Sequence, residues 1–379
     1  MNFEEHAAKP LLARFAIAVP ESHLAHTPEE AEAAAKFIGP CVVKAQVPTG
    51  KRGKAGGIKL ASTPAEARAH AEKIIGMEIG GWPVRKVLVE AQTPIARELY
   101  AAILDDSASK GPVLLFSALG GMDVEEAAER DPNAMRRISI AIENGLDEAT
   151  ARKAIGGLDL DAAADALTDT LLKLYRAWRE LDAELIEINP LVLTKDGKVV
   201  ALDCKLTLDD GAAPRQAGIV GNAAPEKRTT LEAKAADAGL KYIELDGNVG
   251  VLANGAGLTM TTMDVIAHYG GSPSNFLEIG GEAYTKAKTA LSILLENPNI
   301  KSLLVNFCGA FARTDVMAEG VVNAWLELKP DIPIFFTIHG TGADEAVVLV
   351  KERLGIEPFN LMDDAVKAAV AAANGRAGA

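Results

Sequence analysis

At 379 residues the chain is longer than one hydrophobic core usually supports, so we expect two or three globular domains. The formal net charge of -13 argues against a general nucleic-acid-binding protein, because such a protein needs a basic face to neutralise phosphates. Three distant cysteines in apolar surroundings (Cys41, Cys204, Cys308) predict buried thiols. With no apolar signal sequence and no run of 18 apolar residues, we predict a cytoplasmic protein without a membrane span.

The first hundred residues predict short strands that alternate with capped helices. Residues 3–15 have apolar positions at helical spacing, although Pro10 interrupts them, and residues 16–20 predict a strand. Two Thr-Pro-x-Glu sequences, beginning at Thr27 and Thr63, are typical of capping boxes with proline at the first helical position. Each is expected to begin an alanine-rich helix.

A glycine-rich cationic loop follows the apolar strand that carries Lys44. It contains Gly50, Lys51, Arg52, Gly53 and Lys54. Glycines let the backbone approach a ligand closely, and lysine and arginine neutralise phosphate oxygens, so the loop favours a nucleotide-phosphate site. It lacks the P-loop sequence, and no helix follows it as in a dinucleotide-binding fingerprint. Taken alone, it is also compatible with a solvated basic turn.

A predicted hairpin lies further along the chain, where Asp196-Gly197 separates two apolar runs. Such a hairpin can bring Glu187, Asn189 and Asp203 together at one end. Oxygen ligands of this kind suit Mg²⁺, which binds through one or two carboxylates and keeps substrate phosphates as further ligands. The alternative is that these polar side chains simply alternate outward along a strand.

Beyond residue 235 the pattern changes to strands and helices in regular alternation, which predicts a parallel sheet with crossover helices. We therefore expect one domain over residues 1–235, with a small subdomain at roughly 20–92, and a second over 236–379. The second resembles a flavodoxin-like (Rossmann-like) open sheet, which binds ligands at the carboxyl ends of its strands. The expected strands are 249–253, 274–278, 301–306, 332–337 and 357–360.

These motifs together resemble the β subunit of the succinyl-CoA synthetase (succinate–CoA ligase) family, whose relatives include malate–CoA ligase and ATP-citrate lyase. The resemblance runs through the motifs around Lys44, Arg52, Glu90, Glu98 and Glu187. It continues through those that contain Asp203, Asp246, Asn254 and Thr262. It implies an α/β chain with an N-terminal ATP-grasp domain followed by a flavodoxin-like CoA-ligase domain.

The resemblance also assigns roles to residues of this sequence. Lys44 and the loop of residues 50–54 match the contacts to the nucleotide phosphates, and Glu90, Thr93 and Glu98 match positions that hold the base and ribose. Asn189 and Asp203 match the Mg²⁺ ligands, and Lys44 and Glu187 are expected to be catalytic. Asn254, Ala310, Phe311 and Ala312 match the acyl-substrate site, with Asn254 also expected to be catalytic. Pro20 occupies a position where GTP-specific members carry glutamine, which favours ATP.

The resemblance further implies a partner. Family members transfer a phosphoryl group from ATP to a histidine and then to the acid, and CoA displaces phosphate from the resulting acyl phosphate. The histidine and the CoA site lie on a separate α subunit in an αβ or (αβ)₂ assembly, and none of the six histidines here has that sequence context. Thr314 is expected to cap a helix that faces the partner's phosphohistidine; the alternative is an ordinary crossover helix.

Departures from the family pattern concentrate around the acid. The turn that usually reads Gly-Gly-Ile-Val-Arg is Gly-Ala-Phe-Ala-Arg at 309–313, and His339 replaces a carboxylate. We therefore expect a short di- or tricarboxylic acid other than succinate, such as malate or citrate. Two alternatives remain: a non-catalytic or regulatory ATP-binding subunit, and an ATP-grasp carboxylate–amine ligase.

Overall fold

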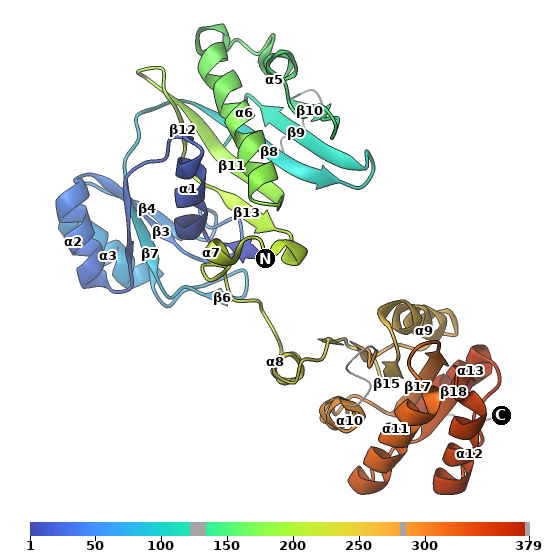
Figure 1. Cartoon of the computed structure of the whole chain (residues 1–379). Coiled ribbons are helices and arrows are strands. Elements are labelled where there is room, and N and C mark those ends of the chain that lie inside the picture. The colour runs from blue at the N-terminus through green and yellow to red at the C-terminus, as the bar shows by residue number, and fades with distance from the viewer. Residues whose placement is uncertain (122–133, 281–285, 376–379) are drawn as a thin grey trace. The chain divides into compact units, whose positions relative to one another are not determined.

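The structure is a computed structural model that describes residues 1–121, 134–280 and 286–375. The chain forms two compact units, Met1–Pro225 and Glu226–Ala379 (Figure 1). The division expected from the sequence, between residues 235 and 236, falls inside helix α8 (Thr230–Asp237). Within the described ranges, no helix combines the length and the apolar character needed to cross a membrane.

The first unit contains a four-stranded antiparallel sheet with two helices on one face. The strands lie in the order β2 (Ser22–Ala25), β7 (Val87–Ala91), β3 (Cys41–Ala45) and β4 (Ile58–Ala61), and the helices are α2 (Pro28–Ile38) and α3 (Pro64–Ile74). Val43 and Ala45 pack against the helices. Because strand side chains alternate between faces, Lys44 is directed to the opposite face.

The predicted threonine caps of α2 and α3 are present. Thr27 and Thr63 each accept a hydrogen bond from the glutamate amide three residues later, at 3.2 Å. The glutamate side chains do not return to the cap residues, as a full capping box requires, but accept from the amides of His26 and Ser62, one residue earlier. A reciprocal capping box begins α8 instead, at Thr229.

A larger sheet forms the rest of the first unit, in the order β1-β13-β11-β8-β9-β10, with β12 paired to β11. Its strands are β1 (Asn2–Phe3), β8 (Ile95–Asp106), β9 (Gly111–Ser117), β10 (Met135–Ser139), β11 (Ala183–Thr194), β12 (Val199–Ala201) and β13 (Lys205–Leu208). The predicted hairpin is confirmed by the antiparallel pairing of β11 with β12. The amphipathic helix α6 (Ala164–Glu180) buries Leu167, Leu171 and Leu174 against this sheet.

Smaller elements complete this unit. They are α1 (Glu5–Arg14), α5 (Glu148–Ile155), α7 (Ala217–Val220), the two-stranded pair β5 (Glu78–Ile79) and β6 (Trp82–Pro83), and the 3₁₀ turns Asp161–Ala163 and Asp210–Ala212. Helix α1 continues through Pro10 to Arg14.

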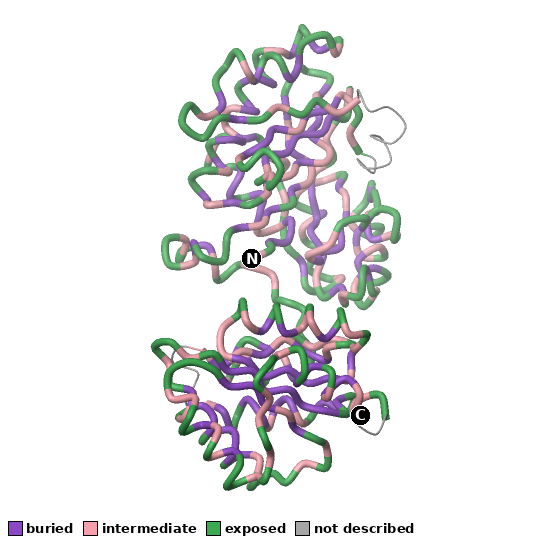
Figure 2. The backbone as a smooth tube through the Cα atoms, turned by 90° about the vertical axis from the view of Figure 1, so that its right-hand side faces the viewer, coloured by how far each residue is buried: buried purple, intermediate pink, exposed green. Residues whose placement is uncertain are grey.

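The second unit has a parallel sheet with helices on both faces, as predicted. Strands β15 (Val249–Ala253), β17 (Ser302–Gly309) and β18 (Ile334–Gly340) pair in that order. Helices α9 (Ala256–His268) and α13 (Met362–Ala373) cover one face, and α10 (Ala287–Leu295), α11 (Thr314–Leu328) and α12 (Ala343–Leu354) the other. The sheet strands are largely buried in the tube view (Figure 2).

The outer positions of this sheet are less regular than the sequence predicted. Strand β16 (Asn275–Leu277) forms parallel bridges at its flanks with β15 but pairs along its length with the antiparallel β14 (Tyr242–Glu244). The strand expected at 357–360 is wrong: only Phe359 bridges to Thr337, because the preceding Pro358 has no amide hydrogen to extend the ladder. The spatial order of the segments, from β16 through β15, β17 and β18 to Phe359, is nevertheless the flavodoxin-type arrangement.

Two further predictions are wrong. Residues 17–20 form no strand, since Pro20 cannot donate to a ladder, and pairing begins only at Ser22. Cys308 is exposed, whereas Cys41 and Cys204 are buried as expected. Cys308 is near the carboxyl end of β17, beyond the strand's buried section, which explains its exposure.

Candidate functional site

A cleft of about 970 Å³ in the first unit is lined by most of the residues that the sequence singled out there. They come from β3, the loop after it, β7, the segment between β7 and β8, β11 and the segment between β12 and β13. They are Lys44, Gly50, Lys51, Arg52, Gly53, Lys54, Glu90, Thr93, Glu187, Asn189 and Asp203. Glu98 is exposed on β8 and does not belong to this lining. Strand alternation and loops thus bring residues as distant in the sequence as Lys44 and Asp203 into one concave site.

Strand register places Lys44 and Glu90 on the same face of the small sheet. Val42 pairs with Glu90 across β3 and β7, and Lys44 lies two residues further along β3. Lys44 Nζ donates to Glu90 Oε1 at 2.7 Å and to the carbonyl oxygen of Leu202 at 2.6 Å. Burial opposes the charge of Lys44, but the neighbouring carboxylates raise its pKa above the ordinary value. Lys44 is therefore a cation at the cleft wall.

The cationic loop divides its charges between the surface and the interior. Lys51 and Lys54 are exposed along the cleft, whereas Arg52 is only 5% exposed. The Arg52 guanidinium donates to the carbonyl oxygen of Ala45 at 2.8 Å and to Asp203 Oδ1 at 2.7 Å. These contacts tie the loop to both sheets of the unit.

Gly57 closes the loop where no side chain fits. A Cβ atom there would lie 2.7 Å from the Ile79 side chain and 3.0 Å from Cβ of Ala45. The amide of Gly57 also donates to the carbonyl oxygen of Arg52 at 2.9 Å. The glycine thus lets the loop return to β4 against the sheet.

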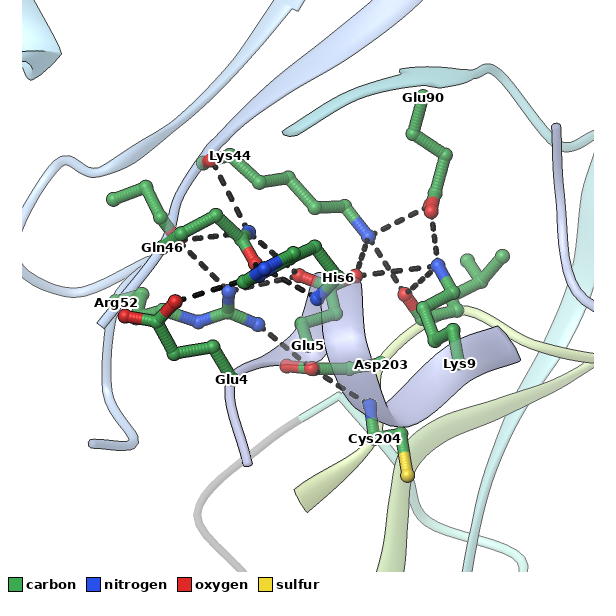
Figure 3. Close-up of polar contacts among 12 residues, drawn as sticks. Glu4, Glu5, His6, Lys9, Lys44, Gln46, Arg52, Glu90, Asp203 and Cys204 are labelled. Atoms are coloured by element: carbon green, nitrogen blue, oxygen red, sulfur yellow. Dashed lines mark hydrogen bonds and ion pairs between the residues drawn. The ribbon is translucent and has the colours of Figure 1, made fainter. Parts of the chain in front are cut away.

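Helix α1 contributes two charged residues that sequence reasoning missed, Glu5 and Lys9 (Figure 3). Glu5 is 3% exposed and contacts three cations: Lys44 Nζ at 2.9 Å, Arg52 Nη1 at 2.8 Å and Lys9 Nζ at 3.2 Å. Burial opposes the charge of Glu5, but these cations outweigh it and hold its pKa well below the usual range. A signal existed, because Glu5 and Lys9 fall at helical spacing on the stripe that Ala8 and Leu12 occupy.

Asn189 and Asp203 supply oxygen atoms to the same cleft. Asn189 Oδ1 accepts from the amide of Gly121 at 2.9 Å, and Asp203 Oδ1 accepts from the amide of Cys204 at 2.8 Å as well as from Arg52. Among the residues described, no group of three or more histidine, cysteine or carboxylate side chains is assembled for a metal ion. One carboxylate and one amide oxygen in this cleft nevertheless fit Mg²⁺, which completes its coordination with water and phosphates.

The neighbouring Glu187 is half-buried on β11 and also lines the cleft. Burial raises the pKa of its carboxyl, the ammonium of Lys205 lowers it, and Asp203 raises it. Glu90, on the opposite wall, is buried, which raises its pKa, while Lys44 and Lys9 favour its charged form.

In the second unit, Asn254 and residues 310–312 lie at the carboxyl edge of the parallel sheet. Asn254 follows β15, and its side-chain amide bridges to the next strand: Oδ1 accepts from the amide of Cys308 at 2.7 Å, and Nδ2 donates to the Cys308 carbonyl oxygen at 2.9 Å. The turn after β17 holds Ala310, Phe311 and Ala312, and the Phe311 side chain is fully exposed. This edge is where open α/β sheets bind ligands.

The expected cap at Thr314 is wrong. Thr314 is the first residue of α11 and is buried, and its hydroxyl donates to the carbonyl oxygen of Thr341 at 3.0 Å. The cap position falls on Arg313, which gives no side-chain cap. Thr314 therefore links the turn after β17 to the turn after β18 and does not cap the N-terminus of α11.

The two units match two different protein families. Residues 2–193 match the ATP-grasp domain family and residues 252–371 match the CoA-ligase family. The β subunit of a GDP-forming succinate–CoA ligase from Thermus thermophilus is 41% identical over 379 residues, covering 100% of both chains. The chain belongs to the succinate–CoA ligase β-subunit family.

A second relative supports that assignment, and a solved structure has the same fold. The ADP-forming succinate–CoA ligase β subunit of Rubrobacter xylanophilus is 43% identical over 356 residues, 93% of each chain. The fold also matches ATP citrate lyase from Methanothrix soehngenii, with a TM-score of 0.74 and 24% identity over 97% of this chain and 98% of that one. The predicted ATP-grasp domain followed by a CoA-ligase domain is confirmed.

Proposed function

We propose that this chain is the nucleotide-binding β subunit of an ADP-forming acid–CoA ligase. The observation that carries the proposal is the cleft in which Lys44, Arg52 and Asp203 lie within one connected set of ion pairs. Cations beside a glycine-rich loop suit a triphosphate, and the nearby carboxylate and amide oxygens suit its magnesium ion. Membership of the succinate–CoA ligase β-subunit family supports the use of this site for acid–CoA ligation.

In the proposed reaction, the terminal phosphoryl group of ATP passes to a histidine of a partner α subunit and from there to the carboxylate of the acid. The thiol of CoA then attacks the acyl carbon, and phosphate leaves with the former acyl–oxygen bond electrons. Division into these steps replaces one difficult reaction with easier ones. CoA is held mainly by the partner, so this chain contributes the nucleotide and acid sites.

The proposed roles within the first unit follow from position. Lys44 and Arg52 bind and orient phosphate oxygens, and residues 50–54 cover them as a flap. Asn189 and Asp203 would hold Mg²⁺, which supplies positive charge against the phosphates during transfer. Glu187 lies beside this pair as a candidate catalytic carboxylate.

Glu90, Thr93 and Glu98 are proposed to hold the base and ribose. Glu90 and Thr93 line the cleft, which supports their part in the proposal. Relatives include both GDP-forming and ADP-forming enzymes. We favour ATP because Pro20 replaces the glutamine of GTP-specific members, and comparison of ADP with GDP formation tests that choice.

For the acid, the proposed site is Asn254 with Ala310, Phe311 and Ala312. The named relatives are succinate–CoA ligases. The exposed Phe311 and His339, both at this edge, change the volume and charge offered to an acid, which supports malate, citrate or another short dicarboxylate or tricarboxylate. The cytoplasmic location and the αβ or (αβ)₂ assembly expected from the sequence stay predictions.

The test is ADP formation by the chain co-expressed with its α partner, supplied with Mg-ATP, CoA and a panel of carboxylic acids. Turnover with one acid that Asp203→Ala abolishes, and that the control Glu184→Ala at an exposed position of β11 leaves intact, supports the proposal. Phosphorylation of the partner histidine without turnover on any acid would direct the search to other acids. Mg-ATP binding without any phosphorylation would contradict the catalytic proposal and leave a regulatory subunit.

A further inference from the structure

Lys9 is a fully buried lysine that the proposed chemistry does not use. Its side chain is 2% exposed, and it does not line the cleft. Lys9 Nζ donates to Glu5 Oε1 at 3.2 Å, to the carbonyl oxygen of Leu202 at 3.0 Å and to Glu90 Oε2 (Figure 3). Burial of an ammonium group costs free energy unless the group is paired with anions or hydrogen-bond acceptors. The buried position of Lys9 therefore raises the question of what its charge does.

Lys9 and Lys44 share the same three acceptors. Lys44 Nζ also contacts Glu5 Oε1, the Glu90 carboxylate and the carbonyl oxygen of Leu202. The difference between the two lysines is their access, since Lys44 lines the cleft and Lys9 does not. An ammonium has three hydrogens, so Lys44 must give up at least one of these contacts to donate to a phosphate.

The surrounding charges balance only when Lys9 is counted. With all carboxylates ionised, the connected set comprises three anions and three cations: Glu5, Glu90, Asp203, Lys9, Lys44 and Arg52. Without Lys9 the set would carry one net negative charge at the wall where phosphates are expected. Glu5 and Glu90 would also lose their remaining ammonium partner whenever Lys44 turned to a phosphate.

We propose that Lys9 is a positioning residue for nucleotide binding, which neutralises Glu5 and Glu90 from behind the cleft so that Lys44 can engage a phosphate. The i,i+4 spacing of Glu5 and Lys9 on α1 places the compensating charge on the same helix as the carboxylate that it neutralises. Lys9 thus acts through Lys44 and needs no contact with the nucleotide. This inference rests on the proposed nucleotide site.

The test measures ATP binding to the full-length chain by isothermal titration calorimetry, with Mg²⁺ present. Lys9→Met removes the positive charge and keeps a side chain of similar length. For a unit charge about 8 Å from a phosphate charge, at an effective dielectric constant of about 20, this loss is expected to raise the Kd for ATP by about 30-fold. Glu5→Gln combined with Lys9→Met restores the charge balance and is expected to return the Kd to within about threefold of the wild type. Lys9→Arg retains the charge and checks that a folded variant still binds.

Each outcome separates charge compensation from simple packing. Lys36→Met, at an exposed site on α2, is the matched control for loss of one lysine and should leave the Kd unchanged. A folded Lys9→Met chain with wild-type Kd would overturn the inference, and so would a double variant as weak as Lys9→Met alone. Absence of ATP binding by the wild type would instead overturn the proposed nucleotide site.

Discussion

Substitution of Gly340 by alanine should disturb the proposed acid site through the backbone. Gly340 ends β18 with φ +87°, and an added Cβ would lie 2.0 Å from the carbonyl oxygen of Gly309 on the neighbouring strand. The left-handed conformation costs an L-residue about 1–2 kcal/mol, and forced overlap with the backbone of the neighbouring strand adds about 1–3 kcal/mol. Together these give a loss of about 2–5 kcal/mol in the free energy of unfolding.

Gly355 provides a matched control because it has φ +68° but no atom within 4 Å of an added Cβ. Gly355→Ala should therefore cost only the conformational part, about 1–2 kcal/mol. Urea unfolding of both variants, followed by circular dichroism, measures the difference. Equal destabilisation of the two variants would refute the argument from close approach.

The same substitution should have a functional effect that is confined to the acid. The turn after β17 is tied to the residue that follows Gly340, since the Thr341 amide donates to the Gly309 carbonyl oxygen at 3.1 Å and its hydroxyl to that of Ala310 at 3.0 Å. With the α partner present, Gly340→Ala should raise the KM for the acid, while ATP binding in the other unit stays unchanged. A normal KM for the acid would contradict placement of the substrate at residues 310–312.

Three further predictions concern the first unit. Asp203→Asn removes a proposed magnesium ligand and the anionic partner of Arg52, so ADP formation should fall at least about 100-fold, with a raised Mg²⁺ requirement in rate titrations. Hydrogen bonds from Ser109 and the ion pair with Arg137 lower the pKa of Asp106 to about 2. Ionised Asp106 therefore stabilises the fold above about pH 4, near its unfolded pKa, and this contribution is lost as the pH falls to about 2. The free energies of urea unfolding of Asp106→Asn and of the wild type should therefore become equal as the pH falls from about 4 to about 2. Thr63→Ala removes a helix cap and should cost about 1 kcal/mol in urea unfolding, whereas the adjacent Ser62→Ala should stay within about 0.5 kcal/mol.

The sequence predicted those parts of the fold that are encoded locally. Proline and threonine at the start of α2 and α3, and Asp196-Gly197 in the hairpin, fix backbone geometry through neighbouring residues alone. Strand edges were less predictable, because pairing depends on distant partners. Pro20 and Pro358 illustrate this limit, since each removed a ladder donor from an apolar segment that otherwise reads as a strand.

The candidate site shows the same division. Lys44 and the loop of residues 50–54 were identifiable because glycines and cations adjoin one strand. Glu5 and Lys9 were missed because each reads as an ordinary charge of an amphipathic helix, and only tertiary packing buries them beside Lys44. Charged residues on the apolar stripe of a helix are the pattern that would have indicated them.

The edge of the large sheet has a consequence for biosynthesis. Among the strands that the structure describes, β1 pairs only with β13, and Asn2 is opposite Thr207 and Phe3 opposite Leu206. Helix α1 follows β1 directly, so it cannot reach its native position until the ribosome has synthesised more than two hundred residues, up to β13. Closure of so long a loop is also entropically unfavourable and slow. The small sheet, whose strands all lie within Ser22–Ala91, can form much earlier. During that interval Lys44 lacks Glu5, so the nascent chain carries an unfinished cationic site, and completion of the ion-pair network coincides with the arrival of β13.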